Sequence, residues 1–304
     1  MHTVEVTDLA KSFGNVQAVA HVTFSVAPGE IFGMLGPNGA GKTTTIRLLL
    51  DILKPDRGSV SILNGPMTEA KKDRIGYMPE ERGLYQEMEL EKCLVYLGTL
   101  KGLPAGEARR RAGIYLERFD LAQHGRKKVK ELSRGMQQKA QIINTVLSGP
   151  ELVIVDEPFS GLDPINTQLV KELLRELRER GTTIIMSTHM MQQVEELCDR
   201  IVLINKGANV LYGRVDQIRR DYSGHAVLVR VRGDLPPLSG VLGAVSHNGA
   251  HQLTLSGSTT PSQILEQLVG SRVDVEQFEI AVPTLDEIFI RVVQEEAAMG
   301  GAEP

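Results

Sequence analysis

The segment of residues 36–44, Gly-Pro-Asn-Gly-Ala-Gly-Lys-Thr-Thr, restricts the possible folds of this chain more than any other stretch. It follows an apolar run that is expected to form a strand, Ile31–Leu35, and precedes a helix-like run, Thr45–Leu50. A G-x-x-x-x-G-K-T motif in this strand–loop–helix setting arranges backbone N–H groups and a helix N-terminus around phosphate oxygens. The segment therefore predicts a nucleoside triphosphate site, in which Lys42 would contact the β- and γ-phosphates and Thr43 would ligate Mg²⁺. The expected binding residues are Gly36, Pro37, Asn38, Gly39, Ala40, Gly41, Lys42, Thr43 and Thr44.

Composition and charge argue against several classes of protein. The 304 residues include 34 Lys and Arg against 38 Asp and Glu, a net charge of −4, which disfavours a nucleic-acid-binding face. Aliphatic runs such as Ile201–Ile204 are far shorter than the roughly 20 residues that span a bilayer. Met1–Val6 alternates like a strand rather than a secretory leader, and Cys93 and Cys198 are too few for a disulfide framework. We therefore expect a soluble cytoplasmic protein that reaches a membrane only through a partner.

Residues 1–213 have the alternating strand and helix pattern of a three-layer α/β domain. An alternating N-terminal stretch, Thr3–Leu9 and Val22–Val26, predicts an antiparallel β addition, and residues 87–147 predict an inserted, mostly helical subdomain. The core strands are expected to be covered on both faces because consecutive positions are apolar. These strands are Ile31–Leu35, Leu152–Val155, Thr183–Met186 and Ile201–Ile204.

Residues 214–296 are expected to form a small α+β domain. Two capping boxes, at Thr260 with Gln263 and at Thr284 with Glu287, predict the starts of two helices. The last segment, residues 297–304, is rich in Gly and Ala and is expected to be a flexible tail. The predicted strands are Ala226–Arg232, Gln252–Ser256 and Val273–Ile280.

Two adjacent carboxylates, Asp156 and Glu157, end the apolar run that begins at Leu152. In a protein with a P-loop, such an Asp lies at the Mg²⁺ site beside the P-loop threonine. The neighbouring Glu157 is then placed to act on the water that attacks the γ-phosphorus. Without the P-loop, the same residues would indicate only a strand end that meets solvent.

Ser133 precedes an amphipathic helix and is a good N-cap residue. The alternative hypothesis is that this second helix N-terminus, with Gly135, binds phosphate of a nucleotide held elsewhere. Under this hypothesis, residues 132–136, Leu-Ser-Arg-Gly-Met, contribute to function as well as to folding.

Six ordered motifs resemble those of the nucleotide-binding subunit of an ATP-binding cassette (ABC) transporter, and the resemblance covers about residues 3–213. They are the P-loop at 36–43, a Q-loop at 78–80, a signature at 132–136, Walker B at 156–157, Ser-Gly-Leu-Asp at 160–163 and Ser-Thr-His at 187–189. The resemblance implies ATP as substrate, Mg²⁺ as cofactor, and ATP hydrolysis. It also implies a P-loop NTPase fold for the first domain.

The resemblance assigns roles to further residues. Phe13 would stack on adenine, the alternative being a phenylalanine buried in the core. His189 would hydrogen-bond the γ-phosphate and, with Glu157 and Glu80, form the catalytic set. Thr43, Asp156 and Glu80 would ligate the metal, and Ser133 and Gly135 would contact the nucleotide.

Two positions depart from the family pattern. Glu80 replaces the usual Gln of the Q-loop, which keeps a metal ligand but adds negative charge near the γ-phosphate. The signature has Arg134 in place of the first Gly and Met136 in place of the final Gln, whereas Ser133 and Gly135 are kept. Arg134 would either add positive charge near the triphosphate or face solvent.

The resemblance implies two kinds of partner. In the family, two cassettes meet head-to-tail around ATP, so a second subunit is expected, most simply in a homodimer. The runs Ile75–Tyr85 and Pro283–Phe289 are similar to those of ABC-2 exporters of the sodium-efflux and daunorubicin type. An integral membrane permease of ABC-2 type is therefore the expected partner, with the protein peripheral on the inner face of the cell membrane.

The alternative function is that of a non-transport ABC ATPase acting on nucleic acid or ribosomes. Repair-type members carry a long coiled coil between P-loop and signature, but Lys42 and Ser133 are only 91 residues apart. Ribosomal members have two cassettes in one chain, and this chain has one. A GTPase is also disfavoured, because Asn205-Lys206-Gly207-Ala208 lacks the closing Asp of the guanine-binding motif.

Overall fold

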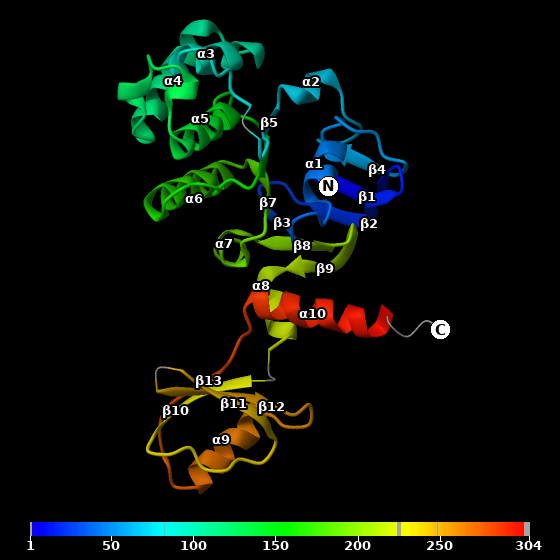
Figure 1. The fold of residues 1–304 in the computed structure, drawn as a ribbon, viewed down its shortest axis with the longest axis vertical. Helices are drawn as coiled ribbons and strands as arrows, with labels where there is room; N and C mark the ends of the chain where they lie inside the picture. Colours follow the sequence, from blue (N-terminus) through cyan, green and yellow to red (C-terminus); the bar gives the residue numbers. More distant parts are fainter. Residues whose placement is uncertain (1, 82, 224–225, 248, 301–304) are drawn as a thin grey trace. The chain divides into compact units, whose positions relative to one another are not determined.

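The computed structural model describes residues 2–81, 83–223, 226–247 and 249–300 (Figure 1). The chain forms two compact units, residues 1–213 and residues 214–304. Each unit has a sheet and a hydrophobic cluster of its own. Within the described ranges, no helix combines the length and the apolar composition that crossing a bilayer requires.

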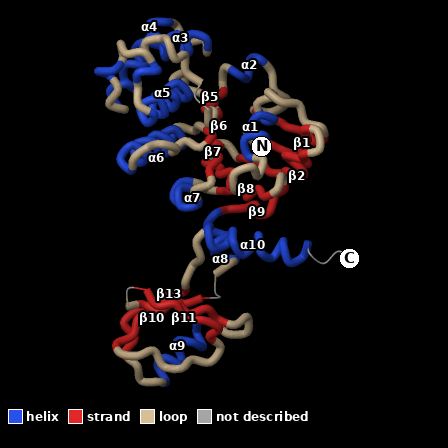
Figure 2. Tube along the Cα trace, in the orientation of Figure 1, coloured by secondary structure: helices blue, strands red, loops and turns tan. Residues whose placement is uncertain are grey.

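The first unit alternates strands and helices along the chain (Figure 2). Its strands are β1 (Val4–Phe13), β2 (Val16–Val26), β3 (Ile31–Leu35), β4 (Arg57–Ile62), β5 (Ile75–Met78), β6 (Leu152–Asp156), β7 (Thr183–Thr188), β8 (Arg200–Asn205) and β9 (Ala208–Arg214). Its helices are α1 (Lys42–Leu49), α2 (Glu69–Lys72), α3 (Leu90–Leu100), α4 (Ala105–Arg118), α5 (Arg134–Val146), α6 (Pro164–Glu179) and α7 (Met191–Leu197), with short 3₁₀ turns η1 (Ala122–His124) and η2 (Val129–Glu131).

The strands of the first unit form a mixed sheet. The order in the described part of the chain is β4-β1-β2-β9-β8-β3-β7-β6-β5. Pairing is parallel from β8 through β3, β7 and β6 to β5, and antiparallel from β4 through β1 to β2. The predicted antiparallel addition and the four predicted core strands are therefore confirmed. Parallel neighbours end at the same edge, which brings the segments after β3, β6 and β7 together.

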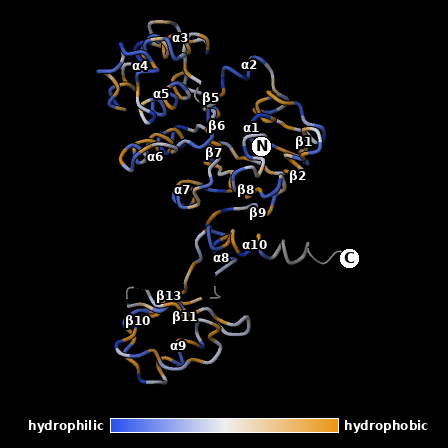
Figure 3. Tube along the Cα trace, in the orientation of Figure 1, coloured by the Kyte–Doolittle hydropathy of each residue, from blue (hydrophilic) through white to orange (hydrophobic). Residues whose placement is uncertain are grey.

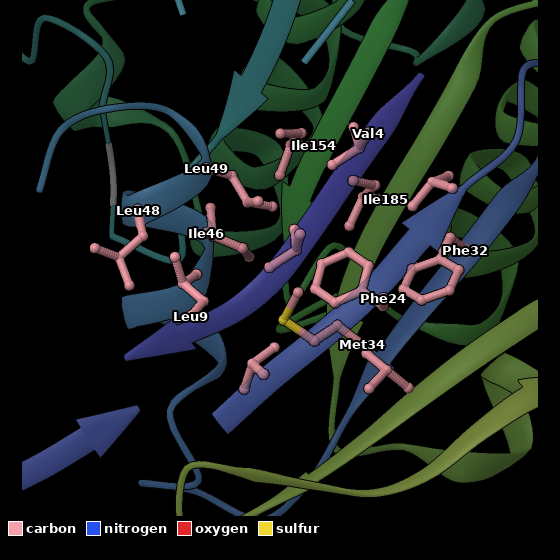
Figure 4. Close-up of a cluster of buried hydrophobic side chains, with 14 of the residues drawn as sticks. Val4, Leu9, Phe24, Phe32, Met34, Ile46, Leu48, Leu49, Ile154 and Ile185 are labelled. Carbon is pink, nitrogen blue, oxygen red and sulfur yellow. The ribbon is translucent and has the colours of Figure 1, made fainter. Parts of the chain in front are cut away.

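Every residue of β3, β6 and β7 is buried, as expected for strands covered on both faces. The rings of Phe24 and Phe32 stack with centroids 5.1 Å apart, and Met34 and Ile46 belong to the same cluster, which joins α1 to the sheet (Figure 4). Gly33 points to the other face, where a Cβ atom would lie 3.2 Å from Val194 of α7. Helices on both faces thus hold the central strands in place.

Three helices, α3, α4 and α5, occupy the region where a helical subdomain is predicted. Hydrophilic and hydrophobic residues alternate along α4 and α6, as expected for helices with one buried face (Figure 3). Ser133 is the N-cap of α5, as predicted, and Asp163 is the N-cap of α6. Strands β4, β5 and β9 were not predicted, because β5 is four residues long and the other two are largely half-exposed or exposed.

The second unit contains a small antiparallel sheet with the order β11-β12-β10-β13 in its described part. The capping boxes at Thr260 and Thr284 form as predicted. The helix after Thr284 continues to Gly300, so residues 297–300, predicted as part of a flexible tail, are helical, and residues 301–304 lie outside the described residues. The elements are α8 (Val215–Asp221), β10 (Ala226–Arg232), β11 (Val241–His247), β12 (Ala250–Leu255), α9 (Pro261–Gly270), β13 (Asp274–Ile280) and α10 (Leu285–Gly300).

Candidate active site

The loop of residues 36–41 leads from β3 to α1 through glycines in left-handed conformations. Gly36 has φ 149°, and a Cβ atom there would lie 2.1 Å from the carbonyl oxygen of Ile204. Gly41 has φ 105°, and its Cβ would lie 2.4 Å from the carbonyl oxygen of Ala18. Both contacts are far below any tolerable distance, so the path of the loop between β8 and β2 requires glycine at both positions.

Helix α1 begins at Lys42, directly after this loop, and no side chain caps its N-terminus. Its first N–H groups and the positive end of its dipole are therefore suited to an anion. The Lys42 ammonium, in a residue only 7% exposed, donates to the carbonyl oxygens of Gly36 at 2.7 Å and Pro37 at 3.1 Å. Burial lowers the pKa of Lys42, and the carboxylates of Glu157, Asp156 and Glu80 partly oppose that shift.

A cavity of about 280 Å³ lies at the start of α1. It joins the predicted phosphate-binding loop to all three predicted acidic residues. A second cavity of about 220 Å³ shares Thr43 and Glu80 with it. The residues that line the first cavity are Ala18, Asn38, Gly39, Gly41, Lys42, Thr43, Thr44, Glu80, Asp156 and Glu157.

Asp156 is the last residue of β6 and pairs in register with Ser187 of β7. Its Oδ2 accepts a hydrogen bond from the Thr43 hydroxyl at 2.8 Å, and its Oδ1 accepts one from the Ser187 hydroxyl. A carboxylate and a hydroxyl side by side are the hard oxygen ligands that suit Mg²⁺. The donor set of Asp156 and Thr43 therefore fits such an ion.

Glu157 is held in a strained and almost completely buried position. It has φ 49°, an unusual value for a residue with a side chain, and its N–H donates to the carbonyl oxygen of Ser187 at 3.0 Å. The carboxylate accepts from the Thr188 hydroxyl at 3.1 Å and from the backbone N–H of His189 at 3.1 Å, and its Oε1 lies 2.8 Å from Nδ1 of His189. The structure thus fixes this carboxylate at the wall of the cavity, beside the loop of residues 36–41.

Three residues to which the sequence analysis gave no individual role support this arrangement, two of them, Ser187 and Thr188, within the Ser-Thr-His motif. Gln138 of α5 donates to the carbonyl oxygens of Glu157 at 3.2 Å and of Pro158 at 3.1 Å. Ser187 and Thr188 contribute the hydroxyl contacts to the two carboxylates. The sequence signal for Ser187 and Thr188 was that both carry a hydroxyl group at the end of an apolar strand, where buried polar groups need hydrogen-bond partners.

The structure does not bring every predicted site residue into this cavity. Phe13 lies at the end of β1 and is 47% exposed, which rules out the alternative that it is a buried core residue. Ser133 caps α5 by accepting from the N–H of Met136 at 3.3 Å. Gly135 lies against the loop after β6, where its Cβ would be 3.2 Å from the carbonyl oxygen of Gly161. None of these three lines the cavity among the residues that the structure describes.

Comparison with known proteins gives matches in both units. A family profile described as ABC transporter matches residues 19–160. A second, described as the C-terminal domain of DrrA1-3-like ATP-binding proteins, matches residues 213–293. An uncharacterized ABC transporter ATP-binding protein of Bacillus subtilis, YhaQ, is 40% identical over 94% of this chain and 96% of its own length.

Two further proteins are similar over much of the chain. Nod factor export ATP-binding protein I of Bradyrhizobium diazoefficiens is 33% identical over 96% of this chain and 97% of its own. A solved structure of an ATP-binding subunit of an ABC transporter matches with a TM-score of 0.68 and 34% identity, over 72% of this chain and 93% of that one. Since relatives more than 30% identical extend over almost the whole sequence, this protein belongs to the ATP-binding proteins of ABC transporters, which bind and hydrolyse ATP.

Proposed function

We propose that two copies of this chain close around ATP and Mg²⁺ and that the resulting hydrolysis drives a separate membrane permease in export. The arrangement of Glu157 beside Lys42, with Ser133 outside the cavity, is the observation that carries this proposal. The protein would act at the cytoplasmic face of the membrane through that permease.

In this proposal the loop of residues 36–44 holds the phosphates. The N–H groups at the start of α1 and the Lys42 ammonium would bind the β- and γ-phosphates, replacing the contacts that Lys42 makes with Gly36 and Pro37. Mg²⁺ would be held by Thr43 and Asp156, with Glu80 as a further oxygen ligand, and would neutralise negative charge on the phosphates. The exposed ring of Phe13 is available to stack on adenine.

Glu157 would act on the attacking water. Its carboxylate takes a proton as the water oxygen bonds to the γ-phosphorus, and the bond from that phosphorus to the β–γ bridging oxygen breaks. The products are ADP and inorganic phosphate. His189, Thr188 and the strained backbone would hold the carboxylate in place, so that little reorganisation is needed for the proton transfer.

The position of Ser133 supports a dimer. The N-terminus of α5 is exposed at Ser133 and belongs to a segment that does not line the chain's own cavity. Ser133 and Gly135 would therefore contact the nucleotide of the other subunit, as the family resemblance implies. Removal of the γ-phosphate would then break contacts across the dimer and let the two copies separate.

A pair of exposed tyrosines supports docking of a permease on the helical subdomain. The rings of Tyr85 and Tyr96 lie edge to face with centroids 5.7 Å apart, and they are 49% and 43% exposed. Exposed aromatic rings are enriched at protein interfaces. The export role in the name of the Nod factor relative, together with the DrrA-like match at residues 213–293, favours an exporter with a permease of ABC-2 type.

The variant Glu157→Gln tests the proposal. It should retain ATP binding, lower turnover about 10²–10⁴-fold, and accumulate as an ATP-bound dimer in size-exclusion chromatography. Glu179→Gln, at the end of α6, is the matched control and should behave as the wild type. A Glu157→Gln variant that stays monomeric with ATP, together with a wild-type specific activity that does not change on dilution, would contradict the dimer.

A further inference from the structure

A larger cavity, of about 710 Å³, lies at the opposite ends of the same strands. The phosphate-binding cavity adjoins the ends of β3, β6 and β7, whereas this one is lined by Glu151, just before β6, and by Thr183, the first residue of β7. Strands of five or six residues separate the two cavities by roughly 15–20 Å. A molecule bound here would therefore not touch the nucleotide.

The walls of this cavity come from two parts of the first unit. One wall is a face of α4 that carries Arg110, Arg111, Ile114 and Tyr115. The facing wall comes from the ends of α5 and α6 and from the loops before β6 and β7. An occupant would thus contact the helical subdomain and the α/β layer at once.

The floor of the cavity offers polar groups next to apolar surface. The hydroxyls of Thr3 and Thr183, two buried residues, lie 3.1 Å apart, and the buried Thr182 also lines the cavity. Apolar surface is contributed by Ile114, Leu147 and Leu177 among others. Polar and apolar groups contribute about equally to the lining, which suits a ligand that has both a polar and an apolar part.

Positive charge exceeds negative charge around the cavity. Glu151 is the acidic residue among the described lining residues, and Arg74 pairs with it through two hydrogen bonds of 2.6 Å. Arg110 and Arg111 share one carboxylate, that of Glu107, at 2.7–2.8 Å. The pair of Arg110 and Arg111 therefore carries one positive charge that Glu107 does not compensate.

Arg180 adds a second uncompensated charge. The carboxylate of Glu176 lies 3.9 Å from its guanidinium and is already engaged by Arg118 through hydrogen bonds of 2.6 and 2.7 Å. The side chain of Arg180 is 72% exposed and can turn towards an occupant. Guanidinium groups bind carboxylates, sulfonates and phosphates through paired N–H donors.

We propose that this cavity binds a small amphipathic anion, whose charged group contacts Arg110 and Arg180 and whose apolar body packs on Ile114, Leu147 and Leu177. The ligand is a second one, distinct from ATP, and the proposal does not depend on the roles assigned to the catalytic residues. Because it bridges α4 and the α/β layer, such a ligand would restrict movement between them.

Binding of 8-anilinonaphthalene-1-sulfonate, an amphipathic anion, tests the proposal. The fluorescence titration uses the full chain with saturating ADP and Mg²⁺, so that the nucleotide site is occupied. The double variant Arg110→Glu/Arg180→Glu should bind the probe about tenfold or more weakly, since two charge-assisted contacts are replaced by repulsion. Arg109→Glu is the control, because Arg109 lies on the same helix and is not among the lining residues.

A neutral probe separates charge recognition from general apolar binding. N-phenyl-1-naphthylamine has the same aromatic body without the sulfonate and should bind at least several-fold more weakly to the wild type. Circular dichroism melts of all variants verify that they are folded. Equal affinity for the two probes, an unchanged affinity in the folded double variant, or the absence of saturable binding would each overturn the proposal.

Discussion

Nδ1 of His189 lies 2.8 Å from Oε1 of Glu157, and the backbone N–H of His189 donates to the same oxygen at 3.1 Å. One residue thus anchors the carboxylate through both its ring and its backbone. The ring contact is a hydrogen bond in the tautomer that carries its proton on Nδ1. The imidazole side chain is 55% exposed, so it remains accessible to a ligand while it contacts Glu157.

Replacement of His189 by Ala should lower kcat at least about tenfold and leave ADP affinity nearly unchanged. The variant keeps the backbone contact to Glu157 but loses the ring that orients the carboxylate. The measurements are steady-state hydrolysis and equilibrium ADP binding, with His251→Ala in the second unit as control. Full activity of the His189→Ala variant would show that the ring contact has no part in turnover.

Ser133 provides a test of the signature segment that is free of folding effects. Ser133→Asp should preserve the N-cap of α5, because Asp accepts the same hydrogen bond from the N–H of Met136. It should abolish hydrolysis by placing a negative charge against the triphosphate of the partner subunit, while monomer affinity for ADP remains. Ser59→Asp, on the exposed strand β4, is the control. Loss of monomer ADP affinity would instead place Ser133 at its own chain's nucleotide.

The P-loop strand and the Walker B strand could be predicted from local sequence, because each is a continuous apolar run next to a recognisable motif. The hydrogen bonds of Ser187 and Thr188 to the two carboxylates could not be predicted from local sequence. They depend on the register of β7 against β6, which sets Ser187 beside Asp156. A shift of one residue would turn those hydroxyls to the opposite face, and sequence alone does not specify that register.

The antiparallel strand β4 was missed for a different reason. It begins Arg-Gly-Ser, and only its last residue, Ile62, is buried, so its place in the sheet depends on pairing with β1 rather than on its own composition. The arginine-lined cavity was missed because its walls come from α4 and from loops more than 30 residues away in sequence. In both cases the determining contacts are tertiary.

The two cysteines should be unreactive in the folded protein. Cys93 and Cys198 are 0% and 8% exposed, and burial raises the pKa of both thiols, which disfavours the reactive thiolate. Maleimide at pH 8 should therefore label neither residue on a timescale that labels a Ser59→Cys variant fully. In a concentration of urea that unfolds the protein, both thiols should react with maleimide. Rapid labelling of Cys198 under native conditions would indicate that the packing of α7 on β3 opens readily.

Substitution by Ala should lower the stability of the protein at Gly36 and raise it at Gly113. Ala at Gly36 would put its Cβ 2.1 Å from the carbonyl oxygen of Ile204 at a φ of 149°, so the loop and β8 must shift. We expect a destabilisation of about 3 kcal/mol or more, which corresponds to a Tm lower by about 6–12 °C for a unit of this size, and loss of nucleotide binding.

Gly113 lies within α4, where a Cβ meets no atom within 4 Å. Ala there should stabilise the helix by about 0.5–1 kcal/mol and raise Tm by about 1–4 °C, because alanine loses less backbone entropy on folding. Thermal melts with and without ADP measure both effects. A Gly36→Ala variant that retained both the wild-type Tm and the wild-type ADP affinity would contradict this prediction. It would show that the loop tolerates a side chain against β8, and that the close approach of Gly36 to Ile204 does not determine the shape of the phosphate site.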